Sequence, residues 1–200
     1  MHRLLAPLLF ILCLGAPALA HDVVVQGVSK TVSGWPIAAF TLTDLQGKPF
    51  TQNNLQGRWT FVLFGDTQCG RECTDALAAL DGLYKRIAGA DALKATQVVF
   101  IALDPQRDTP ARIREYLRPF DARFIGSTGP PATLARLADD MGLADDAAAA
   151  SASSPDHDHN REHRRSLLLI GPDSVVRVRY VAPYDVLRLT SHFMRTRSRR

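Results

Sequence analysis

The sequence predicts an α/β sandwich with a mixed central sheet, and three observations point to it. Buried, β-rich runs alternate with segments of helical apolar spacing, a strand pair closes the chain, and the composition is that of a globular protein. Of the 200 residues, 46% are hydrophobic and 22% are charged, which excludes collagen-like, coiled-coil and wholly disordered chains. Beyond the N-terminus no apolar run reaches 18 residues, so the pattern also excludes a polytopic membrane protein.

The first half of the chain carries strands and a helix around a pair of cysteines. Residues 40–50 alternate apolar and polar side chains around Gln46 and Gly47, which predicts a hairpin. Residues 59–64 are continuously apolar and β-rich, as is typical of a buried central strand. A helix is expected from about Glu72, and a second buried strand over residues 97–103.

The second half continues the alternation and ends on a strand pair and a helix. Thr109 as N-cap and Pro110 at the first helical position predict a helix start. The elements expected after it are a strand at 124–125, a helix over 132–141, strands at 166–170 and 175–181, and a terminal helix over 183–194. Residues 144–160 are rich in Ala, Ser and Asp without bulky apolar side chains, which indicates a flexible, solvated insertion.

The first 20 residues have the pattern of a secretory signal peptide. Arg3 precedes an apolar stretch from Leu4 to Leu14, and Ala18 and Ala20 match the small residues of a cleavage site. We therefore expect a periplasmic protein whose mature chain begins at His21, with a folded domain over residues 21–194. The alternative is an uncleaved leader that anchors the chain in the membrane.

The positive net charge is concentrated at the C-terminus. The formal charge is +4, but 19 basic residues face 20 acidic ones once five arginines are set aside: Arg3, Arg195, Arg197, Arg199 and Arg200. We interpret residues 195–200 as a basic tail that is solvated or weakly contacts an anionic surface. No basic stripe interleaved with aromatic residues accompanies it, so nucleic-acid binding is not expected and any membrane contact is at most peripheral.

Two cysteines remain after removal of Cys13 with the leader, and their spacing suggests chemistry. Cys69 and Cys73 lie between a buried strand and a helix, and residues four apart share a helix face, so both sulfurs can point to one spot. A bridge across so small a loop would add little stability. The helix N-terminus stabilises thiolate, which is both a nucleophile and a metal ligand. An inert structural disulfide is the alternative.

Three motifs together resemble the SCO/SenC family of copper chaperones, which serve assembly of the dinuclear copper centre of cytochrome c oxidase. They are residues 64–69 (Phe-Gly-Asp-Thr-Gln-Cys), the C-x-x-x-C pair and residues 103–110 (Leu-Asp-Pro-Gln-Arg-Asp-Thr-Pro). The resemblance covers about residues 40–180. It implies a thioredoxin-like three-layer sandwich with a mixed central sheet, and a copper ion bound by two cysteines and one distant histidine.

The resemblance points to His163 as the third ligand, because this histidine precedes a strand and lies nine residues before Pro172. The implied copper ligands are thus Cys69, Cys73 and His163. Two thiolates and an imidazole suit Cu(I), whereas Zn(II) would normally take a fourth ligand. Asp104 either orients the cysteine loop or only fixes the turn that it forms with Pro105.

The sequence also departs from the family pattern near the cysteines. Asp66 stands where the family usually has Tyr, Gly70 and Thr74 stand where it has Pro after each cysteine, and Arg164 follows the histidine. Gly70 is expected to loosen the loop, and the arginines at 71, 164 and 165 add positive charge that would lower thiol pKa values. Lesser candidates for loose metal capture are His21, His157 and His159; His192 is assigned no role.

Three functions remain open at this stage. The first is an exported copper chaperone whose partner is the copper-bearing subunit of cytochrome c oxidase or another copper or thiol carrier protein. The second is a periplasmic thiol-disulfide oxidoreductase that cycles Cys69 and Cys73 without a metal. The third is a passive binding module with a permanent disulfide.

Overall fold

The computed structural model describes residues 29–31, 36–143 and 166–198. Eight strands of this part of the chain form one sheet in the order β1-β8-β7-β4-β5-β6-β2-β3. Strands β4 (Trp59–Gly65), β5 (Thr96–Ala102) and β6 (Ile125–Thr128) run parallel to one another. The other neighbours are antiparallel. The prediction of a mixed sheet is therefore confirmed.

Two antiparallel units flank the parallel strands. Strands β7 (Ser166–Ile170), β8 (Val176–Val181) and β1 (Ser29–Thr31) extend the sheet beyond β4, and β2 (Thr41–Asp44) and β3 (Pro49–Thr51) extend it beyond β6. The predicted hairpin is β2–β3. Its turn is fixed by the Asp44 carboxylate, which accepts hydrogen bonds from the backbone N–H groups of Gln46 and Lys48, each at 2.8 Å.

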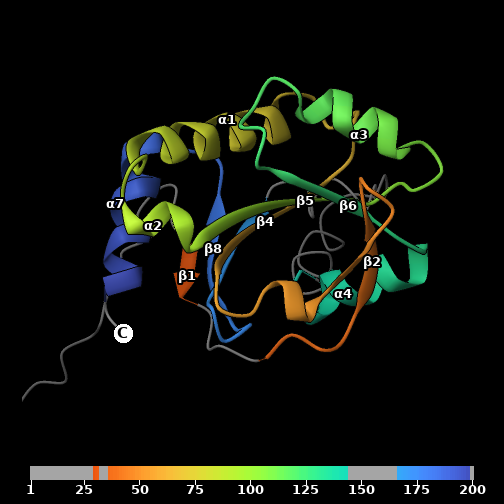
Figure 1. Ribbon diagram of the computed structural model, residues 1–200, viewed down its shortest axis with the longest axis horizontal. Coiled ribbons are helices and arrows are strands. Elements are labelled where there is room, and N and C mark those ends of the chain that lie inside the picture. Colours follow the sequence, from red (N-terminus) through yellow and green to blue (C-terminus); the bar gives the residue numbers. More distant parts are fainter. Residues whose placement is uncertain (1–28, 32–35, 144–165, 199–200) are drawn as a thin grey trace, which may run out of the picture.

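Helices cover both faces of the sheet, which makes three layers (Figure 1). Helices α1 (Gly70–Arg86), α3 (Pro110–Leu117) and α7 (Val186–Ser198) pack on one face, in the cluster that contains Phe61 and Leu63 of β4. Helix α4 (Pro131–Asp140) packs on the other face, against Val62 and Phe64. Alternate residues of β4 thus enter two separate apolar clusters, and every residue of this strand is buried.

Most of the predicted elements are present, with corrections at their ends. Thr109 caps α3 by accepting a hydrogen bond from the Arg112 N–H at 3.3 Å, and Pro110 begins the helix, as predicted. Helix α1 begins at Gly70, two residues before the expected start. The three-residue strand β1, the 3-10 helix η1 (Gln52–Asn54) and the short helix α2 (Asp91–Lys94) were not predicted, because elements so short carry no periodic pattern.

The terminal helix differs most from its prediction. Helix α7 begins at Val186 because the Asp185 carboxylate accepts the Arg188 N–H at 2.8 Å, in the manner of an N-cap. It continues to Ser198, so residues 195–198 belong to this helix, whereas the sequence predicted that they form a separate basic tail. The predicted insertion at 144–160 lies outside the described residues. No helix in the described ranges is long and apolar enough to cross a bilayer.

Candidate metal and redox site

The two cysteines lie at the junction of the central strand β4 and helix α1. Cys69 is the N-cap residue of α1 and Cys73 lies one turn later, with 5.7 Å between their Cα atoms. Their Sγ atoms are joined in a disulfide. Cys73 is fully buried and Cys69 is 5% exposed. The expectation that one helical turn brings both sulfurs to one spot is confirmed, and the earlier start of α1 is what places both cysteines on its first turn.

The last residue of β4 must be a glycine for the sulfur of Cys73 to sit where it does. A Cβ atom at Gly65 would lie 2.8 Å from Cys73 Sγ and 3.0 Å from Cε2 of Phe100. Both distances are shorter than ordinary carbon contacts. The backbone oxygen of Gly65 accepts the N–H of Leu103 at 2.8 Å, so the ends of β4 and β5 are tied beneath the cysteine loop. This loop comprises residues 66–68.

Hydrogen bonds within the cysteine loop define its turn. The Asp66 carboxylate accepts the Gln68 N–H at 2.8 Å, and the Asp66 carbonyl accepts the Cys69 N–H at 3.1 Å. The side chain of Asp66 is only 5% exposed. At the position where the family usually has Tyr, this chain therefore uses a carboxylate to form an Asx-type turn into the helix.

Asp108 anchors the cysteine loop from outside it. One carboxylate oxygen, Oδ1, accepts both the backbone N–H of Thr67, at 3.1 Å, and its side-chain hydroxyl, at 2.6 Å. Asp108 is 1% exposed and lies in the segment between β5 and α3. These two bonds join positions 41 residues apart and hold the loop two residues before Cys69.

The residue that anchors the loop is Asp108 and not Asp104, for which the sequence left this role open. Asp104 closes the turn of its own segment, where its carboxylate accepts the Arg107 N–H at 3.3 Å and its carbonyl accepts the Asp108 N–H at 2.7 Å. Asp104 thus fixes the turn, as the second of the two alternatives stated. The signal that could have revealed Asp108 is a carboxylate directly before an N-cap threonine, in a loop that follows a buried strand.

A buried tyrosine lies beside this anchor. Burial raises the pKa of Tyr116 to about 12, and the negative charges of Asp66 and Asp108 add to the rise. Burial also raises the pKa of Asp108, against the lowering effect of the hydrogen bonds from Thr67. Within the described residues, Oδ2 of Asp108 and the hydroxyl of Tyr116 have no hydrogen-bond partner. The loop that precedes the disulfide is therefore held by buried polar groups whose surroundings are largely apolar.

The first turn of α1 is open to solvent on its outer side. Gly70, Arg71 and Glu72 are exposed. Gly70 has a φ of +43°, a value that proline cannot adopt, so the departure from the family's proline goes with a different backbone conformation. Arg71 places one of the three expected positive charges beside the cysteines; Arg164 and Arg165 lie outside the described residues.

The candidate third ligand, His163, lies outside the described residues, as do His21, His157 and His159. His192 lies in α7, where its Nδ1 is 2.9 Å from the hydroxyl of Tyr180. No group of three metal-ligating side chains is present in residues 36–143 and 166–198.

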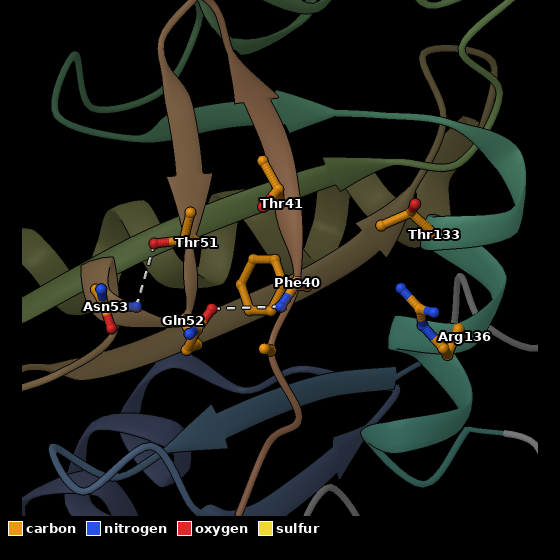
Figure 2. A pocket seen from close by; sticks show the side chains of 8 residues that line it. Phe40, Thr41, Thr51, Gln52, Asn53, Thr133 and Arg136 are labelled. Atoms are coloured by element: carbon orange, nitrogen blue, oxygen red, sulfur yellow. Dashed lines mark hydrogen bonds between the residues drawn. The ribbon is translucent and has the colours of Figure 1, made fainter.

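A hollow lies on the face of the sheet that α4 covers, between the β2–β3 hairpin and α4. Figure 2 shows Thr133 and Arg136 of α4 facing the residues at the open end of the hairpin. Its volume is about 350 Å³. The amide oxygen of Gln52 accepts the Phe40 N–H at 3.3 Å, and the Thr51 hydroxyl accepts the Asn53 N–H, so these polar groups already stabilise the backbone. We assign this hollow no part in the cysteine chemistry.

The fold and the site define a thioredoxin-like α/β protein with a dithiol pair, present here as a disulfide, at the start of its first central helix. A family profile described as SCO1/SenC matches residues 34–193. The chain belongs to the SCO1/SenC family.

Relatives differ in how much of their length the chain covers. A putative copper-binding protein of Stutzerimonas stutzeri is 34% identical over 147 residues, which are 74% of this chain and 70% of that protein. Mitochondrial SCO1 of Saccharomyces cerevisiae is 36% identical over 104 residues, or 52% of this chain and 34% of that protein. The chain therefore spans only about a third of this mitochondrial relative.

Solved structures of the family have the same fold. Copper-bound ScoI of Bradyrhizobium japonicum aligns with a TM-score of 0.60 at 28% identity, over 80% of this chain and 99% of that one. Copper-bound yeast Sco1 aligns with a TM-score of 0.67 at 22% identity, over 82% and 94% of the two chains. The thioredoxin-like architecture expected from the sequence is thus confirmed.

Proposed function

We propose that this chain is an exported copper chaperone that holds one copper ion through Cys69, Cys73 and His163. Its recipient would be the copper-bearing subunit of cytochrome c oxidase or another copper or thiol carrier protein. The observation that carries the proposal is the meeting of both sulfurs on the first turn of α1. Support also comes from family membership and from the copper found in related Sco structures.

Copper binding requires that the disulfide first be reduced. A partner dithiol supplies two electrons and two protons, so that the Cys69–Cys73 bond breaks while the partner's two thiols become a disulfide. The two cysteines then lose their protons as they bind the ion. The positive end of α1 stabilises the thiolates, and two soft sulfur ligands favour Cu(I).

Strand register supports His163 as the third ligand. Strand β7 is antiparallel to β4, with Leu167 paired to Leu63. The chain that leads into β7 therefore approaches the edge of the sheet at which β4 ends and the cysteine loop begins. His163 precedes Ser166, the first residue of β7, by three positions, a distance that a few residues of extended chain can span.

The test is an anaerobic Cu(I) titration of the reduced chain that begins at His21, with X-ray absorption to count sulfur and nitrogen ligands. We expect one ion with two sulfurs and one nitrogen, and loss of the nitrogen in H163A. The matched control is H157A, which removes a histidine six residues away and should bind as the wild type does. Stoichiometric binding that is identical in all three proteins would refute the assignment of His163, and absence of binding would refute the chaperone.

The observed disulfide favours a second candidate, a thiol-disulfide oxidoreductase that uses the same cysteines. Its expectation is turnover with a disulfide substrate that persists in H163A and disappears in C69S. A protein that binds copper with high affinity but shows no such turnover supports the chaperone alone. A pair that resists mild reductants and copper would instead support the passive module.

Export is the remaining part of the proposal. The leader over residues 1–20 would be removed before His21 and leave the domain in the periplasm. The mass of the protein recovered from the periplasm tests this, because cleavage predicts a chain that starts at His21. Recovery of the uncleaved chain with the membrane fraction would instead indicate an anchor.

A further inference from the structure

Helix α7 exposes an apolar pair on its outer side. Leu187 is 56% exposed and Met194 is 37% exposed, and these are the large hydrophobic side chains that the described residues leave open to solvent. They are seven residues apart, so they lie on one face of the helix. Leu189 and Phe193, on the inner face, are buried in the core cluster that contains α1. The exposed pair is therefore not needed for packing.

Positive charge lies at the C-terminal end of α7, near Met194. Arg195 and Arg197 lie in the last turn of α7. The ring of Phe193 contacts that of Trp59 edge to face, with 6.1 Å between centroids, so this turn lies beside the start of β4, where Arg58 precedes the strand. Within the described ranges these three arginines form no ion pair, so they remain available to an external anion.

A basic hollow opens at the same edge of the sheet. Arg58, Lys94 and Arg123 line a pocket of about 270 Å³ together with the ring of Tyr84. The three basic residues precede the parallel strands β4, β5 and β6, whose amino ends share one edge. Arg123 is held in place by two bonds to the Asp121 carboxylate, at 2.7 and 2.6 Å, and Lys94 pairs with Asp91 at 3.5 Å.

We propose that this basic end, formed by Leu187, Met194, Arg195, Arg197 and Arg58 with its pocket, docks on a membrane surface of anionic phospholipids. A helix that presents apolar side chains between arginines lies in the lipid interface, where the apolar groups enter the headgroup boundary and the cations meet phosphates. Because the charged groups of this surface are mainly arginines, its partner should be anionic. Two isolated apolar side chains are too few for the apolar core of a protein interface, so a lipid surface is favoured.

Docking in this way would orient the cysteines. They follow the carboxyl end of β4, whereas the basic end lies at its amino end, so the disulfide would face away from the membrane. Figure 1 shows α7 and α2 together at the left end of the molecule, where α1 ends. The surface would hold the protein near membrane-bound recipients and leave the site accessible.

Vesicle sedimentation tests the proposal on the chain that begins at His21, which retains every helix and strand described. We expect binding to vesicles of equal parts phosphatidylglycerol and phosphatidylcholine, weakening with salt, and little binding to phosphatidylcholine alone. R195Q and R197Q should each lower the partition coefficient by roughly fivefold. L187S with M194S should lower it further at high salt, where the apolar contribution dominates.

The matched control neutralises two exposed cations that are already paired. Arg107 lies 3.4 Å from Asp104, and Arg118 lies 2.8 Å from Glu115, so R107Q with R118Q changes the net charge as much as R195Q combined with R197Q but should leave vesicle binding within twofold. Circular dichroism establishes that each variant is folded. An equal loss in the control, equal affinity for soluble poly-glutamate, or saturation by inorganic phosphate with no vesicle binding would each overturn the proposal.

Discussion

Replacing Asp108 by alanine removes the acceptor of both hydrogen bonds that hold Thr67, and with it the anchor of the cysteine loop. Hydrogen bonds to a charged group each contribute about 1.5–3 kcal/mol. Part of that is offset because a buried carboxylate no longer has to be desolvated. We expect D108A to lower the free energy of unfolding by about 2 kcal/mol, or roughly 4–8 °C in Tm for a chain of this size.

The asparagine variant separates the hydrogen bonds from the charge. The amide oxygen of D108N can still accept both bonds from Thr67, so its loss should be below about 1 kcal/mol, the range of an uncharged bond. Urea unfolding of the three oxidised proteins measures these differences. The loop should also open in D108A, so copper binding and the reduction potential of the disulfide should change more in D108A than in D108N.

The pH dependence gives a second readout of the same residue. Because burial raises the pKa of Asp108 in the folded state, the folded chain holds this proton more tightly than the unfolded chain does. This contribution to stability therefore falls as the pH rises from the ordinary carboxyl value through the raised one. D108N should lack that fall. Equal stability of D108A and the wild type, or an unchanged pH profile in D108N, would refute the role given to Asp108.

Three further variants, two beside the cysteines and one at the basic pocket, are tested by thermal unfolding. G65A should cost about 1–3 kcal/mol, because its Cβ would meet Cys73 Sγ at 2.8 Å; unchanged stability would contradict the close contact. G70P should cost more than about 1 kcal/mol, since the φ of +43° is closed to proline; tolerance would mean that the loop adopts another conformation. D121N should be less sensitive to acid than the wild type, because hydrogen bonds from Arg123 lower the pKa of Asp121 and its stabilisation is lost as the pH falls; equal sensitivity would argue against this pair.

Periodic and local signals in the sequence were sufficient for most of the fold. The apolar run at 59–64 gave the central strand, and the threonine and proline at 109–110 gave the start of α3, because such features act within a few residues. The start of α7 was wrong because Asp185 caps it. Helix α2 was missed because four residues show no helical period.

The site, like the fold, has features that local sequence patterns predict and features that depend on tertiary contacts. The sequence by itself determined that two cysteines, four residues apart, lie between a buried strand and a helix, because that spacing and those patterns are local properties. Only the tertiary structure decided that Asp108, and not Asp104, anchors their loop, and that Phe193 of α7 packs against Trp59 at the start of β4. Those contacts join residues far apart in the chain, and their partners are chosen by the packing of the sheet and its helices, which no local pattern encodes.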